Sequence, residues 1–354
     1  MTIVAGSNAF GFELWARVRA LPGNLAISPA SISTALAMTY AGARGETAKE
    51  MQRVLHLPDG AMQQWDALWR SRGPGRSELR IANRLFGERS LGFEQAVLDE
   101  TAALEPLDFI KHPAQARATI NAWVERETRE RIRELLPVDA ITVDTRLVLV
   151  NALYFLAKWV TPFVDYKTRP AKFLDRDVPT MNNIARFGYA KRDGVQLLAM
   201  PYRGGESMLV MLPDARDGAL DVDADRLAGW RSALETKLVQ VALPKFRIDA
   251  TSPLSLEAPL KALGMTTAFS RDAADFSGMT TAEALCLSSV FHKTFVRVDE
   301  KGTEAAAATA AAMVPRSGPP RPEVTFIADR PFLFAIIDDA TGLVLFLGRC
   351  TSPA

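Results

Sequence analysis

The 354-residue chain has few of the residues that hold small or metal-bound proteins together. Its two cysteines, Cys286 and Cys350, are too few for a disulfide framework, and three histidines do not supply the usual ligands of a zinc site. We therefore expect both cysteines to be buried free thiols, as unpaired cysteines usually are. We also expect no metal ion and no cofactor.

The chain has no excess of charge of one sign, because 42 Lys and Arg oppose 41 Asp and Glu and leave a net charge of +1. No overall field therefore attracts nucleic acid or an anionic membrane. No apolar run approaches the ~20 residues that cross a bilayer. We expect a monomer with no nucleic-acid or membrane partner. The local basic run is expected to be a solvated face rather than a polyanion site: Arg70, Arg72, Arg76, Arg80 and Arg84.

Two kinds of functional signal are also absent. The N-terminus has no basic region followed by an apolar core, so no signal peptide is visible. This indicates either a cytoplasmic protein or a secreted one whose signal has been removed. No G-x-S-x-G, Walker loop or G-x-G-x-x-G occurs, so the sequence offers no enzymatic site.

The residues that are present predict helices first and strands later. Apolar side chains recur at helical spacing over residues 8–20, 29–41 and 114–136. From residue 147 onward, apolar runs typical of strands dominate: 147–150, 196–200, 208–212, 238–243, 290–298, 332–337 and 343–347. This order indicates the α+β class. No linker divides residues 1–354, so we expect a single domain.

One segment, residues 300–322, fits neither pattern. It lies between two predicted strands and runs from an alanine-rich tract at 305–312 into a proline-rich stretch. Alanine favours helix, but no charged residue between Glu304 and Arg316 would keep a surface helix soluble. Small uncharged side chains can instead enter the interior of a sheet. The segment is therefore either an exposed helix or a long exposed connection with the composition of a buried strand.

Residues 300–309, Glu-Lys-Gly-Thr-Glu-Ala-Ala-Ala-Ala-Thr, resemble the proximal hinge of the reactive-centre loop of inhibitory serpins. Other family motifs follow in the family's order along the whole chain. They are residues 24–32 (NLAISPASI), 150–155 (VNALYF) with Lys158 and Trp159, 243–246 (LPKF), 291–293 (FHK) and 329–334 (DRPFLF). An alanine tract alone is weak evidence, whereas this ordered set is strong.

The resemblance implies the serpin fold, with three β-sheets, about eight or nine helices and an exposed reactive-centre loop at about residues 300–322. It also implies a suicide-substrate inhibitor of serine proteases. In the family's mechanism the protease cleaves the loop and forms an acyl-enzyme, and the freed loop inserts as an extra strand into a metastable large sheet. The hinge residues that match are Glu300, Gly302, Thr303, Glu304, Ala305, Ala306, Ala307, Ala308 and Thr309.

The family's spacing places the scissile bond sixteen positions after Glu300, between Arg316 and Ser317. An arginine there fits the aspartate of a trypsin-like specificity pocket. Arg321 is a poor alternative for the cleavage position, because Pro322 follows it and proteases generally do not cleave before proline. The resemblance therefore implies a trypsin-like serine protease as partner, held as a covalent acyl complex.

Two further groups of residues match sites of the family. The shutter is a hydrogen-bonded cluster where the large sheet opens, and four residues match it: Ser28, Ser31, Asn151 and His292. The alternative is that these are ordinary buried polar groups with satisfied hydrogen bonds. The breach is where insertion begins, and three residues match it: Trp159, Lys245 and Glu300. The alternative is a plain core tryptophan beside a surface ion pair of little value.

Two functions of this fold are open from the sequence. One is the protease inhibitor, and the other is a noninhibitory serpin that acts as a chaperone, carrier or storage protein. Noninhibitory relatives commonly depart from the small-residue hinge, whereas this chain keeps Gly302, Thr303 and the alanines. The sequence therefore favours the inhibitor, and neither function is enzymatic.

Overall fold

The computed structural model describes residues 1–72, 77–94, 104–249, 252–303 and 321–353. The helices predicted over 8–20 and 29–41 are present, although the first begins earlier, at Ile3. The second begins at Pro29 because the Ser28 side chain accepts a hydrogen bond from the Ser31 amide and caps the first turn. The α-helices in the described residues are α1 (Ile3–Val18), α2 (Pro29–Ala41), α3 (Gly45–Val54), α4 (Ala61–Ser71), α6 (Pro113–Glu127), α7 (Ala224–Ser232) and α8 (Glu257–Ala262).

A seven-stranded sheet joins strands from distant parts of the chain. Its strand order is β10-β12-β13-β4-β2-β3, with β11 paired to β12. The strands are β2 (Glu78–Glu88), β3 (Leu104–Leu107), β4 (Leu147–Lys158), β10 (Phe246–Asp249), β11 (Leu254–Ser255), β12 (Ser289–Asp299) and β13 (Gly302–Thr303).

The other strands form a nine-stranded path, β1-β16-β15-β8-β7-β6-β9-β14, with β5 paired to β6. The long strand β6 pairs with β9 over residues 180–189 and with β7 over residues 188–192, so its two partners lie mostly along different parts of its length. This arrangement is consistent with the three expected sheets, two of which would share β6. The strands are β1 (Leu25–Ile27), β5 (Arg169–Phe173), β6 (Arg176–Arg192), β7 (Val195–Pro201), β8 (Glu206–Pro213), β9 (Glu235–Pro244), β14 (Val324–Ile327), β15 (Phe332–Asp338) and β16 (Val344–Cys350).

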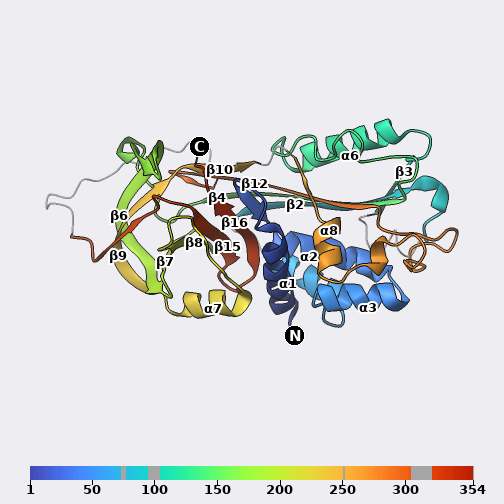
Figure 1. The fold of residues 1–354 in the computed structure, drawn as a ribbon, viewed down its shortest axis with the longest axis horizontal. Coiled ribbons are helices and arrows are strands. Elements are labelled where there is room, and N and C mark those ends of the chain that lie inside the picture. Colours follow the sequence, from blue (N-terminus) through green and yellow to red (C-terminus); the bar gives the residue numbers. More distant parts are fainter. Residues whose placement is uncertain (73–76, 95–103, 250–251, 304–320, 354) are drawn as a thin grey trace.

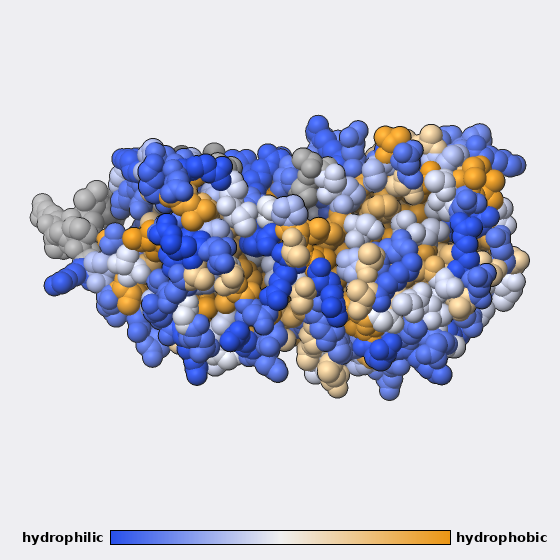
Figure 2. Space-filling model, in the orientation of Figure 1, coloured by the Kyte–Doolittle hydropathy of each residue, from blue (hydrophilic) through white to orange (hydrophobic). Residues whose placement is uncertain are grey.

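The strand β4 of the seven-stranded sheet is buried on both faces over residues 147–155. Alternate side chains of β4 join two different cores: Leu149 and Leu153 belong to the main core, and Val148 and Val150 to a smaller core with α6. Figure 1 shows α6 on one side of β2, β4 and β12, and α1, α2 and α3 on the other. Burial on both faces explains why residues 147–150 read as a continuous apolar run. Figure 2 shows hydrophilic residues over most of the visible surface, with hydrophobic ones in small groups between them.

The helix predicted over residues 114–136 is shorter than expected, because α6 ends at Glu127. The Thr128 hydroxyl donates to the Val124 carbonyl (2.8 Å) and accepts from the Ile132 amide (3.2 Å), which turns the chain back against α6. Ile132 and Leu135 are nevertheless fully buried. Their helical spacing in the sequence therefore reflects the burial of these side chains, and the helix does not continue through them. Beyond the helix end, three residues have positive φ: Arg129, Glu130 and Glu134.

Two expectations about exposure are wrong in part. Both cysteines are free, but Cys286 is only half-buried, while Cys350 is fully buried and burial raises the pKa of its thiol. The basic run is not one solvated face. The Arg70 side chain is 81% exposed, whereas the Arg72 side chain is 10% exposed, because the chain turns inward after α4 and brings Arg72 to buried carboxylates.

Candidate site of loop insertion

The two central strands of the seven-stranded sheet form a fork. β4 and β12 run parallel and pair directly over residues 148–154 and 289–295. Beyond this stretch β13 lies between them and is antiparallel to both, since Thr303 pairs with Val298 on β12 and with Ala157 on β4. The fork therefore holds two residues at its head and is closed by parallel pairing along the rest of its length.

Gly302 and Thr303 are shaped for this position. A Cβ on Gly302 would lie 1.9 Å from the Ala157 carbonyl oxygen, and its φ is +154°, so a side chain there would collide with β4. Thr303 is fully buried, and its hydroxyl lies 2.6 Å from the Tyr202 hydroxyl. The first side chain at the head of the fork is therefore small, buried and hydrogen-bonded.

The residues that match the breach come together around this head. The buried Trp159 donates from Nε1 to the Asp299 carbonyl (3.0 Å), and its ring stacks on Tyr202 with centroids 4.2 Å apart. Glu300 binds Lys245 Nζ at 3.0 Å and accepts from the Thr168 hydroxyl at 2.7 Å. Burial alone would raise the pKa of the Glu300 carboxyl, but the bonds from Thr168 and Lys245 outweigh it and hold the pKa below its usual value.

The residues that match the shutter form one hydrogen-bonded cluster where β4, β12 and the start of α2 meet. His292 Nδ1 contacts the Asn151 side-chain oxygen, and His292 Nε2 accepts from the Ser28 amide at 3.1 Å. Asn151 Nδ2 donates to the Ser31 hydroxyl at 2.6 Å. Because the Ser28 amide is a donor, the proton of the neutral imidazole lies on Nδ1. Burial lowers the pKa of His292 to about 3, so this ring is neutral at pH 7.

Sequence reasoning missed Asn83, which joins this cluster from β2. Its side-chain oxygen accepts from Ser31 Oγ (3.1 Å) and from Asn151 Nδ2, and its Nδ2 donates to the Ser31 carbonyl (3.1 Å). Asparagine is depleted in strands, and its place in an otherwise strand-like stretch was the available signal. The register pairs Asn83 with Asn151 directly, which only the folded sheet reveals.

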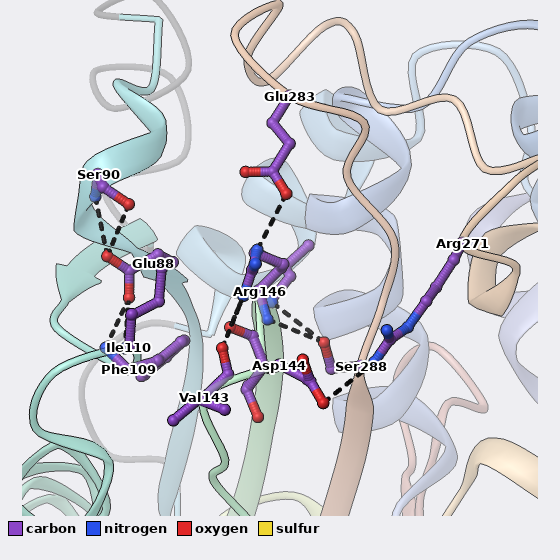
Figure 3. A network of polar contacts seen from close by, with 12 residues as sticks. Glu88, Ser90, Phe109, Ile110, Val143, Asp144, Arg146, Arg271, Glu283 and Ser288 are labelled. Carbon is purple, nitrogen blue, oxygen red and sulfur yellow. Dashed lines mark hydrogen bonds and ion pairs between the residues drawn. The ribbon is translucent and has the colours of Figure 1, made fainter.

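The far end of the fork is closed by a second set of polar contacts that sequence reasoning also missed (Figure 3). Ser288 Oγ accepts from the Arg146 amide (3.0 Å) and the Leu147 amide (3.4 Å), and the Ser288 amide donates to the Leu147 carbonyl (2.9 Å). The Arg146 guanidinium pairs with Glu283 at 3.2 Å. These contacts join the residues that lead into β4 and β12, so they hold the base of the fork shut.

A second set of polar contacts, also drawn in Figure 3, holds the end of the neighbouring strand β2. The buried Glu88 carboxylate accepts from the amides of Ser90 (3.0 Å), Phe109 (2.6 Å) and Ile110 (3.1 Å). Burial alone would raise the pKa of Glu88, but these hydrogen bonds hold it below its usual value.

The rest of the expected hinge and the expected scissile bond lie outside the described residues. This applies to Glu304, Ala305, Ala306, Ala307, Ala308, Thr309, Arg316 and Ser317. Within the described residues, no group of three or more His, Cys, Asp or Glu side chains is placed to hold a metal ion. No helix in the described ranges is both long and apolar enough to cross a membrane.

Comparison with known proteins defines the class of this fold. The family model named Serpin (serine protease inhibitor) matches residues 5–353. Leukocyte elastase inhibitor of Bos taurus is 39% identical over 358 residues, covering 94% of this chain and 93% of that protein. Uncleaved ovalbumin has a TM-score of 0.88 at 28% identity and 100% coverage of both chains. Thyroxine-binding globulin in complex with thyroxine has a TM-score of 0.87 at 28% identity and 99% coverage of both chains. The chain belongs to the serpin family.

Proposed function

We propose that this protein is a suicide-substrate inhibitor of trypsin-like serine proteases, with Arg316–Ser317 as its reactive bond. The observation that carries the proposal is the fork, whose head accepts β13 and whose remaining length is paired in parallel, β4 with β12. The name of its bovine relative, leukocyte elastase inhibitor, supports a protease as partner. We assign the chain no catalytic activity of its own.

The proposed reaction begins as ordinary proteolysis. The serine oxygen of the protease attacks the carbonyl carbon of Arg316, and the bond to the Ser317 nitrogen breaks. That nitrogen takes a proton and leaves as a new N-terminus, while an ester joins Arg316 to the protease. Water would hydrolyse this ester and release a cleaved chain. Inhibition requires the loop to insert before water does so.

The driving force for insertion lies in strand pairing and side-chain size. A strand that continues β13 would replace the parallel ladder between β4 and β12 by two antiparallel ladders. Its alternate side chains would follow Thr303 into the sheet interior, and the next of these are alanines and Thr309. No charge enters the interior, so desolvation does not oppose insertion.

The polar clusters along the fork support distinct roles in this process. We assign the shutter to Ser28, Ser31, Asn151 and His292, because His292 and Asn151 face each other across the two strands that must part. We assign the breach to Trp159, Lys245 and Glu300, which surround the point where β13 enters. We further propose that residues 1–354 act as a single domain and as a monomer.

A carrier is the second candidate. The similar structure of thyroxine-binding globulin was solved with thyroxine, so this fold also occurs in a protein that binds a small molecule. A carrier has no need of a small-residue hinge. The retained Gly302, Thr303 and alanines therefore favour the inhibitor.

A gel assay separates the two candidates. The protein is incubated with trypsin and, in parallel, with an elastase-like protease, and the products are resolved in SDS. We expect an SDS-stable adduct with trypsin. Peptide mapping is expected to show that the released fragment begins at Ser317. Arg316→Ala is the control and is expected to abolish the adduct with trypsin while leaving the fold intact. Cleavage without an adduct would reject the inhibitor, and a first cut at Arg321 would reject the assigned bond.

A further inference from the structure

Arg72 lies in the connection between α4 and β2, and its guanidinium enters the protein. It pairs with the Glu206 carboxylate and, through Nη1, with Asp338 at 2.9 Å. The side chains of Glu206 and Asp338 are 0% and 3% exposed. Burying such a group of charges is expensive and adds little net stability compared with apolar packing. A role in positioning therefore accounts for this buried group better than a gain in stability does.

Glu206 closes the tight turn of residues 202–206 between β7 and β8. Its carbonyl accepts from the Tyr202 amide at 2.7 Å, and the Gly205 amide donates to the Tyr202 carbonyl at 3.3 Å. Ser77, which precedes β2, packs directly on this turn, since a Cβ on Gly204 would lie 2.1 Å from the Ser77 amide nitrogen. The backbone that positions Tyr202 is thus held by Glu206 and contacted by Ser77.

Tyr202 carries this restraint to the head of the fork. Its ring stacks on Trp159 with an interplanar angle of 11°, and Trp159 and Tyr202 also form an isolated antiparallel bridge. Its hydroxyl lies 2.6 Å from the Thr303 hydroxyl. One continuous set of contacts therefore runs from Arg72 through Glu206 and the 202–206 turn to Thr303.

We propose that Arg72 is a positioning residue for loop insertion, acting through Glu206 and Tyr202 on Thr303. This proposal rests on the proposed inhibitory function. By fixing the turn, Arg72 keeps the Tyr202 hydroxyl where it holds Thr303 inside the sheet, so insertion starts with β13 already in place at the head of the fork. Loss of Arg72 lets β13 leave the fork. Insertion is then delayed, and water has more time to hydrolyse the ester and release the cleaved chain. Arg72 is thereby coupled to the outcome at the reactive bond.

Contiguity alone does not demonstrate coupling, so the test is a double-mutant cycle. Arg72→Gln, Tyr202→Phe and the double variant are compared by the moles of inhibitor consumed per mole of trypsin. We expect each single change to raise this ratio on the order of 2- to 10-fold, the lower part of the range that coupled neighbours span. The double variant is expected to match Tyr202→Phe alone. Arg72→Lys keeps one ion pair and is expected to restore part of the wild-type ratio.

Two further measurements separate positioning from general stability. Hydrogen exchange of a peptide covering residues 299–303, measured without protease, is expected to be faster in Arg72→Gln. The matched control is Arg349→Gln, which removes a guanidinium bonded to the carbonyls of Arg19, Leu21 and Gly23 at the α1–β1 turn. It is expected to lower the melting temperature and to leave the ratio and the 299–303 exchange unchanged.

The outcomes that overturn the proposal are distinct from failure of the inhibitory function. Fully additive effects of Arg72→Gln and Tyr202→Phe would show that Arg72 does not act through Tyr202. A lower melting temperature with unchanged 299–303 exchange would leave Arg72 a purely structural residue. If the wild-type protein traps no protease, the inhibitory function fails, and the exchange measurement still decides whether Arg72 holds the head of the fork.

Discussion

His292 and Asn151 face each other across the parallel pair of β12 and β4, joined by a hydrogen bond between the His292 Nδ1 and the Asn151 side-chain oxygen. A strand that enters the fork must separate these two residues. The same contact that stabilises the closed sheet therefore has to break when the sheet opens. Because the ring is neutral and buried, this contact is also sensitive to pH.

The free energy of unfolding is expected to fall as the pH is lowered from 6.5. Burial holds the pKa of His292 at about 3 in the folded protein, whereas the unfolded ring titrates near 6.5. Between these values the unfolded chain binds a proton that the folded chain does not, so stability rises with pH by up to about 1.4 kcal/mol per unit. Denaturant unfolding at pH 6.5, 5.5 and 4.5 measures this slope. His292→Gln is expected to flatten it, and the exposed His112→Gln is expected to leave it unchanged.

Cleavage of the loop is expected to raise the melting temperature. The freed strand would add ladder hydrogen bonds and convert the parallel pair of β4 and β12 into antiparallel pairs. A nick in an ordinary protein does the reverse. Calorimetry of intact and trypsin-cleaved protein makes the comparison. Equal melting temperatures would contradict the metastable sheet even though the fold is that of a serpin.

Thr303→Arg is expected to convert the inhibitor into a substrate. Thr303 is fully buried at the head of the fork. Burying an unpaired charge there costs on the order of several kcal/mol of desolvation free energy. Acylation at Arg316 is expected to be unaffected, because it takes place at a different part of the loop. Gels of the reaction with trypsin are expected to show cleaved chain and active protease in place of the adduct.

Thr303→Ser is the matched control, since it keeps the hydroxyl that meets Tyr202 and adds no charge. It is expected to trap protease nearly as well as the wild-type protein. Wild-type trapping by Thr303→Arg would mean that Thr303 does not enter the sheet or that inhibition occurs by simple occlusion.

Ser288→Ala is expected to loosen the base of the fork. The change removes the acceptor for the Arg146 and Leu147 amides and is expected to cost about 1 kcal/mol of stability. Opening at the base then becomes easier, so a synthetic peptide with the sequence of residues 304–316 is expected to bind faster. Ser289→Ala is the control, because the Ser289 hydroxyl donates only to the adjacent Ser288 carbonyl. Equal binding rates for the two variants would argue against a closing role for Ser288.

Local sequence patterns determined much of the secondary structure of this protein. The helix at 29–41 follows from Ser28 and Pro29, and the strand containing His292 from its alternating apolar face. Short-range rules suffice at these places because a cap, a proline ring and the two-residue period of a strand act within a few residues. The ordered motifs also identified the family before any contact was known.

Tertiary structure alone decided which residues meet. Asn83 joins His292 through the register of three strands, and Arg72 leaves its basic run because Glu206 and Asp338, distant in sequence, are buried beside it. Residues 128–136 kept helical spacing and yet turned back on α6, because burial of Ile132 and Leu135 is satisfied equally well by a loop. Apolar periodicity records which side chains are buried. The partners of buried polar groups depend on strand register and chain crossings, which no local pattern encodes.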